Sequence, residues 1–133
     1  MGTLRAMDET WRFKAHEIIT NHTRNLVCAL GAEAEVKIDV GYPFVYNNPT
    51  LTAQAVKHAQ AFAGSEQVFE TELRMGAEDF AFYAQEIPGC FFRLGAGNKS
   101  KNITSNVHTP TFNIDEAAIE QGIGMMTWLA TQL

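Results

Sequence analysis

The chain has 133 residues, a length that suits a single globular domain with a buried core. Hydrophobic residues make up 46% and charged residues 19%, which excludes a disordered polypeptide. The formal net charge is −5 and no basic run occurs, so a nucleic-acid surface, which needs clustered Lys and Arg, is not expected.

Membrane and export signals are not recognisable in the sequence. No apolar run approaches the roughly 20 residues that span a bilayer, and residues 1–8 lack the apolar core of a secretory signal. Cys28 and Cys90 lie far apart without CxxC spacing, and we interpret both as reduced thiols. A cytoplasmic protein without nucleic-acid or membrane partners is therefore expected.

The first 40 residues predict a strand, a helix and a second strand. Residues 2–7 form the first strand, and Asp8 caps a helix that runs to about Leu30 before Gly31 ends it. Residues 34–40 alternate apolar and charged side chains, as a half-buried strand does. The apolar helix positions recur at helical spacing and should pack on a sheet: Trp11, Ala15, Ile18, Ile19, Leu26 and Ala29.

A change of composition between Gly41 and Pro49 marks the predicted domain boundary, with domains at 1–41 and 42–133. After it we expect helices from Thr50 to Ala63, over 78–85 and from Asp115, and strands over 68–73 and 90–94. The last helix should bury Ile119, Ile123, Met126 and Leu133. Strands and helices that succeed one another in this way predict an α/β (α+β) fold.

His108 is the candidate metal ligand. Neutral imidazole is a common metal ligand, and a loop between a strand and a helix can direct it into a cleft at a sheet edge. Pro110 stiffens the loop. A surface or capping histidine remains the alternative for His108, and solvated helix faces explain the other histidines, His16, His22 and His58.

Two further segments contain candidate pocket residues. Glu78 and Asp79 follow Gly76 at a helix start, where they either cap the helix or point into a pocket. The turn Gly95-Ala96-Gly97-Asn98 could offer backbone amides to a carboxylate or oxyanion, although a tight turn explains its glycines equally well.

Seven short motifs occur in order along nearly the whole chain: Gly2-Thr3-Leu4-Arg5, Gly41-Tyr42-Pro43, Asn47-Asn48-Pro49, Met75-Gly76-Ala77-Glu78-Asp79-Phe80, Ile87-Pro88-Gly89, Leu94-Gly95-Ala96-Gly97 and His108-Thr109-Pro110. This series resembles the C-terminal part of the N-acyl-amino-acid amidohydrolases, a binuclear metallo-amidohydrolase and metallopeptidase family. The family includes hippurate hydrolases, aminoacylases, auxin-conjugate hydrolases and relatives of carboxypeptidase G.

The resemblance implies a fold and a set of site residues. Residues 1–41 would be the last strand, helix and strand of a ferredoxin-like lid that also serves dimerisation. Residues 42–133 would be the C-terminal part of a zinc-peptidase-like α/β catalytic domain. His108 matches the final metal ligand; the substrate-binding or pocket candidates are Arg5, Glu78, Asp79, Gly95 and Gly97.

The family's remaining metal ligands and its general base have no counterpart in this chain, so no catalytic residue is assigned. A single histidine does not hold a catalytic zinc or manganese ion against water. The chain is therefore expected to be inactive alone, as a fragment, a truncated product or one half of a split enzyme for N-acyl amino acids. Its expected partner is a missing N-terminal half or a second copy in a homo-oligomer. The alternatives are a non-catalytic association module, or a lone metal held by His108 at a dimer interface.

Overall fold

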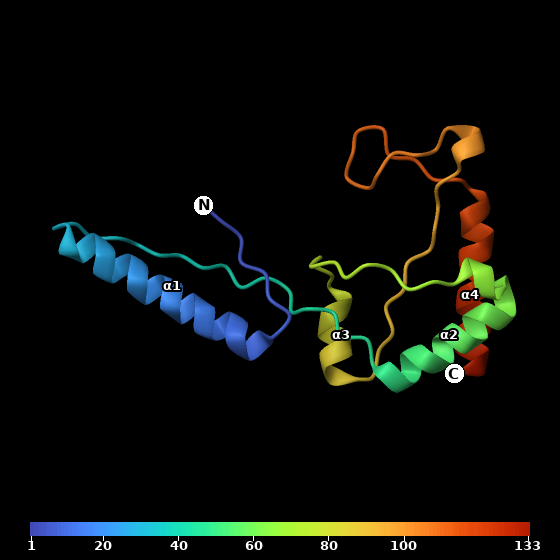
Figure 1. The fold of residues 1–133 in the computed structure, drawn as a ribbon, viewed down its shortest axis with the longest axis horizontal. Coiled ribbons are helices and arrows are strands. Elements are labelled where there is room, and N and C mark those ends of the chain that lie inside the picture. Colours follow the sequence, from blue (N-terminus) through green and yellow to red (C-terminus); the bar gives the residue numbers. More distant parts are fainter. The chain divides into compact units, whose positions relative to one another are not determined.

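The computed structural model describes residues 1–133, which divide into two compact units (Figure 1). The first unit comprises residues 1–46 and 72–87, and the second comprises residues 47–71 and 88–133. The regular elements are all helical. Judged by length and hydropathy, none of the four α-helices could serve as a membrane span.

The long helix of the first unit is α1, Glu9–Ala29 (Figure 1). It begins where the sequence predicts, because the Asp8 carboxylate accepts a hydrogen bond from the Trp11 amide at 2.8 Å. It ends at Leu30, and Gly31 follows with φ of +74°, a backbone conformation that glycine adopts without steric cost. Both predicted ends of this helix are confirmed.

The N-terminal turn of α1 is held by an ion pair that is largely shielded from water. Arg12 is 7% exposed, and its guanidinium forms hydrogen bonds with both carboxylate oxygens of Glu9. Glu9 also accepts a hydrogen bond from the Phe44 amide at 3.3 Å. This bond ties the chain that follows α1 back to the helix start.

The short helix α3, Phe80–Glu86, completes the first unit. Its Phe82 ring meets the Tyr42 ring edge to face at a centroid distance of 5.7 Å. Ala81 on the same helix is fully buried. The helix therefore lies close to the range predicted from the sequence, displaced by one or two residues.

In the second unit, helix α2, Pro49–Ala63, packs on helix α4, Ala117–Gln132. The Trp128 indole on α4 donates to the His58 carbonyl of α2 at 3.0 Å. The cap of α2 is a correction to the prediction from sequence: Asn48, not Thr50, accepts from the Leu51 amide at 3.0 Å. Pro49 can then occupy the first helical position, where its missing N–H costs nothing.

The turns of the second unit include two 3₁₀ helices, η1 at Ser65–Gln67 and η2 at Lys99–Lys101. Asn47 forms two hydrogen bonds with Phe91, which lies 44 positions later in the sequence. Its side-chain nitrogen donates to the Phe91 carbonyl at 2.9 Å, and its side-chain oxygen accepts from the Phe91 amide at 2.8 Å. The Asn48 amide donates to the Gly89 carbonyl at 2.8 Å. These bonds attach the start of α2 to residues 89–91.

The expected strands at 2–7, 34–40, 68–73 and 90–94 are not formed in the structure. The pairing consists of a single antiparallel bridge between Asn98 and Ile103. A strand is stabilised by ladder hydrogen bonds from a neighbouring strand, and these four segments have no such neighbour. The helices of the predicted α/β chain are thus observed, and its sheet is not.

The expected buried faces of two helices are also largely wrong. On α1, Ala15 is buried, whereas Trp11 is 54% and Leu26 67% exposed. On α4 the residues expected inside are exposed: Ile119, Ile123, Met126 and Leu133. The side of α4 that packs carries Gly122, Gly124 and Leu129 instead. The expected faces lack the sheet that would cover them.

Candidate functional site

His108 lies at the exposed tip of a loop in the second unit. Its φ of +64° places it in the left-handed region, which is uncommon for a residue with a side chain. The base of this tip is closed by the Ser105 and Thr111 hydroxyls, 2.8 Å apart. Within it, the Thr109 hydroxyl donates to the Asn106 carbonyl at 2.8 Å. We call residues 105–111 the His108 tip.

The glycine turn Gly95–Gly97 belongs to the same unit and packs against the segment that leads into the tip. A Cβ atom on Gly97 would lie 3.3 Å from the Ile103 carbonyl oxygen, whereas Gly95 has open space around it. The Ala96 carbonyl accepts from the Asp115 amide at 2.8 Å. The turn is thus joined to the start of α4 at the far end of the loop.

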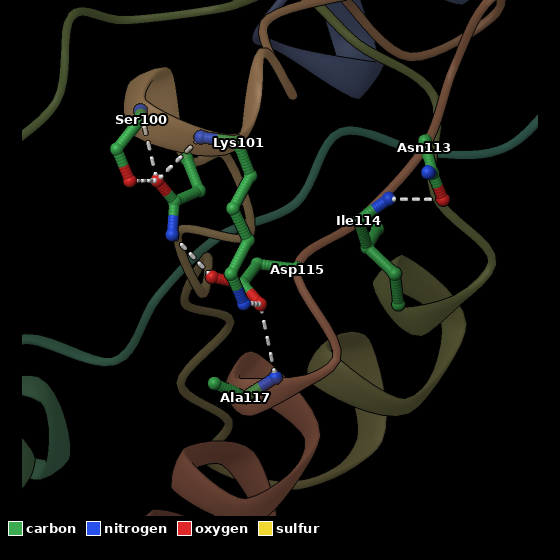
Figure 2. A network of polar contacts seen from close by, with 7 residues as sticks. Ser100, Lys101, Asn113, Ile114, Asp115 and Ala117 are labelled. Carbon is green, nitrogen blue, oxygen red and sulfur yellow. Dashed lines mark hydrogen bonds and ion pairs between the residues drawn. The ribbon is translucent and has the colours of Figure 1, made fainter.

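A polar network surrounds Asp115 (Figure 2). Its carboxylate accepts from the Lys101 ammonium at 2.7 Å and from the Asn98 side-chain amide at 2.5 Å. The hydrogen bond from Lys101, followed by that from Asn98, lowers the pKa of Asp115 from 3.8 to about 2. The Asn98 oxygen in turn accepts from the Ser100 amide at 3.0 Å and the Ser100 hydroxyl at 2.7 Å.

This network contains the residues that sequence reasoning missed. From the sequence, Asn98 is only the end of a glycine turn and Asp115 only the start of a helix. Lys101 is not among the residues for which the sequence predicts a role. The available signal was an acid at a helix start shortly after a lysine-containing loop, and that pattern does not reveal which residues meet.

The other candidates lie in the first unit, where the structure brings two of the motifs together. The exposed Arg5 guanidinium donates to the Met75 carbonyl at 2.7 Å, next to Gly76-Ala77-Glu78-Asp79. Glu78 is half-buried and Asp79 is exposed. Asp79 occupies the position before α3, but its side chain forms no capping hydrogen bond there.

A metal site needs several ligands converging on one point. No group of three or more His, Cys, Asp or Glu side chains is placed to hold a metal ion. His108 alone supplies one nitrogen, whereas zinc sites in proteins use three or four protein ligands. The side chains of this chain therefore do not fit a complete metal centre, and no chemical step is assigned to one.

Comparison with known proteins identifies the family. The model of the peptidase family M20/M25/M40 matches residues 2–132. The chain belongs to this family. Members of peptidase family M20 are generally metal-dependent hydrolases, which agrees with the resemblance found from the seven motifs. The family predicted from the seven motifs is thereby confirmed.

Several relatives are similar over most of this M20 chain. A thermostable carboxypeptidase of Saccharolobus solfataricus is 36% identical over 91% of the chain and 30% of its own length. A Bacillus subtilis protein named as a putative amidohydrolase is 35% identical over 90% of the chain and 30% of its own length. An IAA-amino acid hydrolase of Arabidopsis thaliana is 31% identical over 98% of the chain and 31% of its own length.

The chain thus spans less than a third of the length of these curated relatives. No solved structure matches it.

Proposed function

We propose that this chain is the C-terminal part of a metal-dependent amidohydrolase that cleaves the amide bond of N-acyl amino acids. Family membership over residues 2–132 is the observation that carries the proposal. Relatives whose names describe amidohydrolase and IAA-amino acid hydrolase activities support this type of substrate. Residues 1–41 would form the end of a ferredoxin-like lid, and residues 42–133 the end of the catalytic domain.

In this proposal His108 supplies one ligand to a zinc or manganese ion. The imidazole is exposed at the tip of a loop that the Ser105–Thr111 hydrogen bond closes, so a metal ion bound there could also take ligands from outside the chain. The other ligands of this ion and the general base would come from residues that are not in this chain. Arg5, Glu78, Asp79, Gly95 and Gly97 remain candidates for the substrate pocket.

The exposed apolar side chains of α1 support the proposal that this helix contacts a partner. Trp11, Ile18 and Leu26 are 54%, 47% and 67% exposed, although they recur at helical spacing. Large apolar surfaces of this kind are covered in most proteins. The covering layer would be the missing part of the enzyme or a second copy in a homo-oligomer. The cytoplasmic location remains a prediction.

An amidase assay tests this function directly. The purified chain, mixed with hippurate-like N-acyl amino acids and added zinc or manganese, should show no turnover. A longer polypeptide that also carries the family's upstream ligand motifs should be active, and His108→Ala should abolish its activity. The control is His58→Ala, which changes a half-buried histidine on α2. Robust turnover by the chain alone would refute the proposal.

A further inference from the structure

The segment that carries His108 is closed at two levels. The inner closure is the His108 tip, where the Ser105 and Thr111 hydroxyls meet and the Phe112 amide donates to the Thr109 carbonyl at 3.1 Å. The outer closure lies at residues 96–103 and 115. There, Asn98 and Ile103 exchange two backbone hydrogen bonds of 2.8 Å each.

One carboxylate joins the two ends of the outer closure. Asp115 follows the His108 tip, and its oxygens accept from Lys101 and Asn98, which both precede the tip. Figure 2 shows the Lys101 side chain extended towards Asp115, below the turn that carries Ser100. The backbone amide of Asp115 adds the bond to Ala96. Side chain and backbone of Asp115 therefore both hold residues on the opposite side of the loop.

We propose that Asp115 is a positioning residue that fixes both ends of the 98–115 segment and thereby the placement of His108. The part of this inference that concerns catalysis rests on the proposed function of His108 as a metal ligand. Hydrogen bonds to an ionised carboxylate are roughly twice as strong as neutral ones. The Asp115 side chain is 13% exposed, so water screens these bonds only in part.

Helix capping is the competing role for Asp115. Its Oδ1 atom does accept from the Ala117 amide, the first residue of α4, but at 3.3 Å. The bonds to Lys101 and Asn98 both reach across the loop, and the Lys101 bond is shorter than the cap bond, at 2.7 Å. Capping accounts for the longest of the three bonds and leaves the other two unexplained.

Amide hydrogen exchange on the full chain separates these two roles. Asp115→Asn should raise exchange at the Ile103 and Phe112 amides roughly tenfold, the ratio that corresponds to one lost charge-assisted hydrogen bond. The Phe112 amide is informative because its acceptor, Thr109, lies within the His108 tip. A response confined to the first turn of α4 would show that Asp115 is only a helix cap and would overturn the inference.

Two further variants complete the design. Lys101→Met removes the ammonium group but leaves the Asp115 carboxylate at the helix start, so it should loosen the tip even if Asp115→Asn fails to fold. Asp39→Asn is the charge-matched control, because Asp39 pairs with Lys37 at 3.4 Å with both side chains largely exposed. Equal exchange in the control and the Asp115→Asn variant would contradict a positioning role.

A metal titration of the longer polypeptide links the positioning role to function. Asp115→Asn should raise the metal concentration needed for half-maximal activity at least about tenfold, as loss of a group that orients a ligand does, with kcat at saturating metal largely retained. If exchange at Phe112 rises while His108→Ala stays fully active, the proposed function fails and the positioning role stands. If His108→Ala is inactive while exchange is unchanged in Asp115→Asn, the positioning role fails.

Discussion

The paired hydrogen bonds between Asn47 and Phe91 give a sharp test of the second unit. The Asn47 side chain imitates a neighbouring strand, since it donates to the Phe91 carbonyl at 2.9 Å and accepts from the Phe91 amide at 2.8 Å. Asn47→Asp keeps the shape and the acceptor but loses the donor. An ionised oxygen would then face the Phe91 carbonyl, so we expect this variant to destabilise the fold.

The magnitude follows from the two contacts. The lost hydrogen bond is worth about 1 kcal/mol, and placing a carboxylate oxygen against the Phe91 carbonyl oxygen, where it has no donor, adds about 1 kcal/mol more. With a urea slope of about 2 kcal/mol per molar, the unfolding midpoint at pH 7 should fall by about 1 M. Protonation restores an O–H donor, so the folded form raises the pKa of the carboxyl introduced by Asn47→Asp. The stability it retains is fully present below about pH 4, the unfolded pKa, and is lost as the pH rises through the folded pKa.

Urea titration at pH 7 and at pH 4, followed by fluorescence, measures this difference. Trp128 is a suitable reporter, because it lies in the same unit and donates to α2. Asn48→Asp is the matched control: Asn48 caps α2 by accepting from the Leu51 amide, and aspartate performs this role as well as asparagine. If Asn47→Asp is as neutral as Asn48→Asp at pH 7, the reasoning is wrong.

Three other predictions concern single residues of the second unit. The pKa of Asp115 is lowered from 3.8 to about 2, so its ionised form stabilises the fold above pH 3.8 and this contribution is lost as the pH falls towards 2. Asp115→Asn should therefore flatten that part of a curve of unfolding free energy against pH. An unchanged slope would contradict the lowered pKa of Asp115. A Cβ at Gly122 would meet only the flexible end of Leu94, whereas one at Gly124 would lie 2.8 Å from the Phe62 ring. Gly122→Ala should therefore gain up to about 1 kcal/mol of helix propensity and Gly124→Ala should lose about 1 kcal/mol, and melting shifts of the same sign would count against this packing. With φ of +64°, His108→Gly should relieve roughly 1 kcal/mol of backbone strain and His108→Val should add strain; the reverse order of melting temperatures would show that the loop conformation is different.

Local signals in the sequence predicted the helices well. Asp8 and Gly31 set the ends of α1 because a cap side chain and a left-handed glycine act within a few residues. The cap of α2 was misplaced by two residues, since both Asn48 and Thr50 are good cap residues and Pro49 decides between them. The predicted domain boundary at residue 41/42 is not tested by any of these local interactions.

The site was predicted less completely. The seven ordered motifs led to the family, which the comparison confirms, and they singled out His108. The bonds from Asp115 to Lys101 and Asn98 span 14 and 17 residues, and the Arg5 contact with Met75 spans 70. Such contacts depend on how the chain folds back on itself, and spacing in a sequence does not encode that.

The unformed strands and the exposed helix faces have one physical origin. The alternating pattern of residues 34–40 indicates a strand that needs a neighbouring strand and a covering layer. It does not indicate which residues provide them. The same holds for Ile123 and Met126 on α4, which are 65% and 57% exposed despite helical spacing. Because this chain covers only 30% of the length of its relatives, the partners of these patterns are expected in the remainder of an M20 enzyme. The proposed role of His108 leads to the same expectation, because any ligands that complete a metal site with this imidazole would come from the remainder of an M20 enzyme.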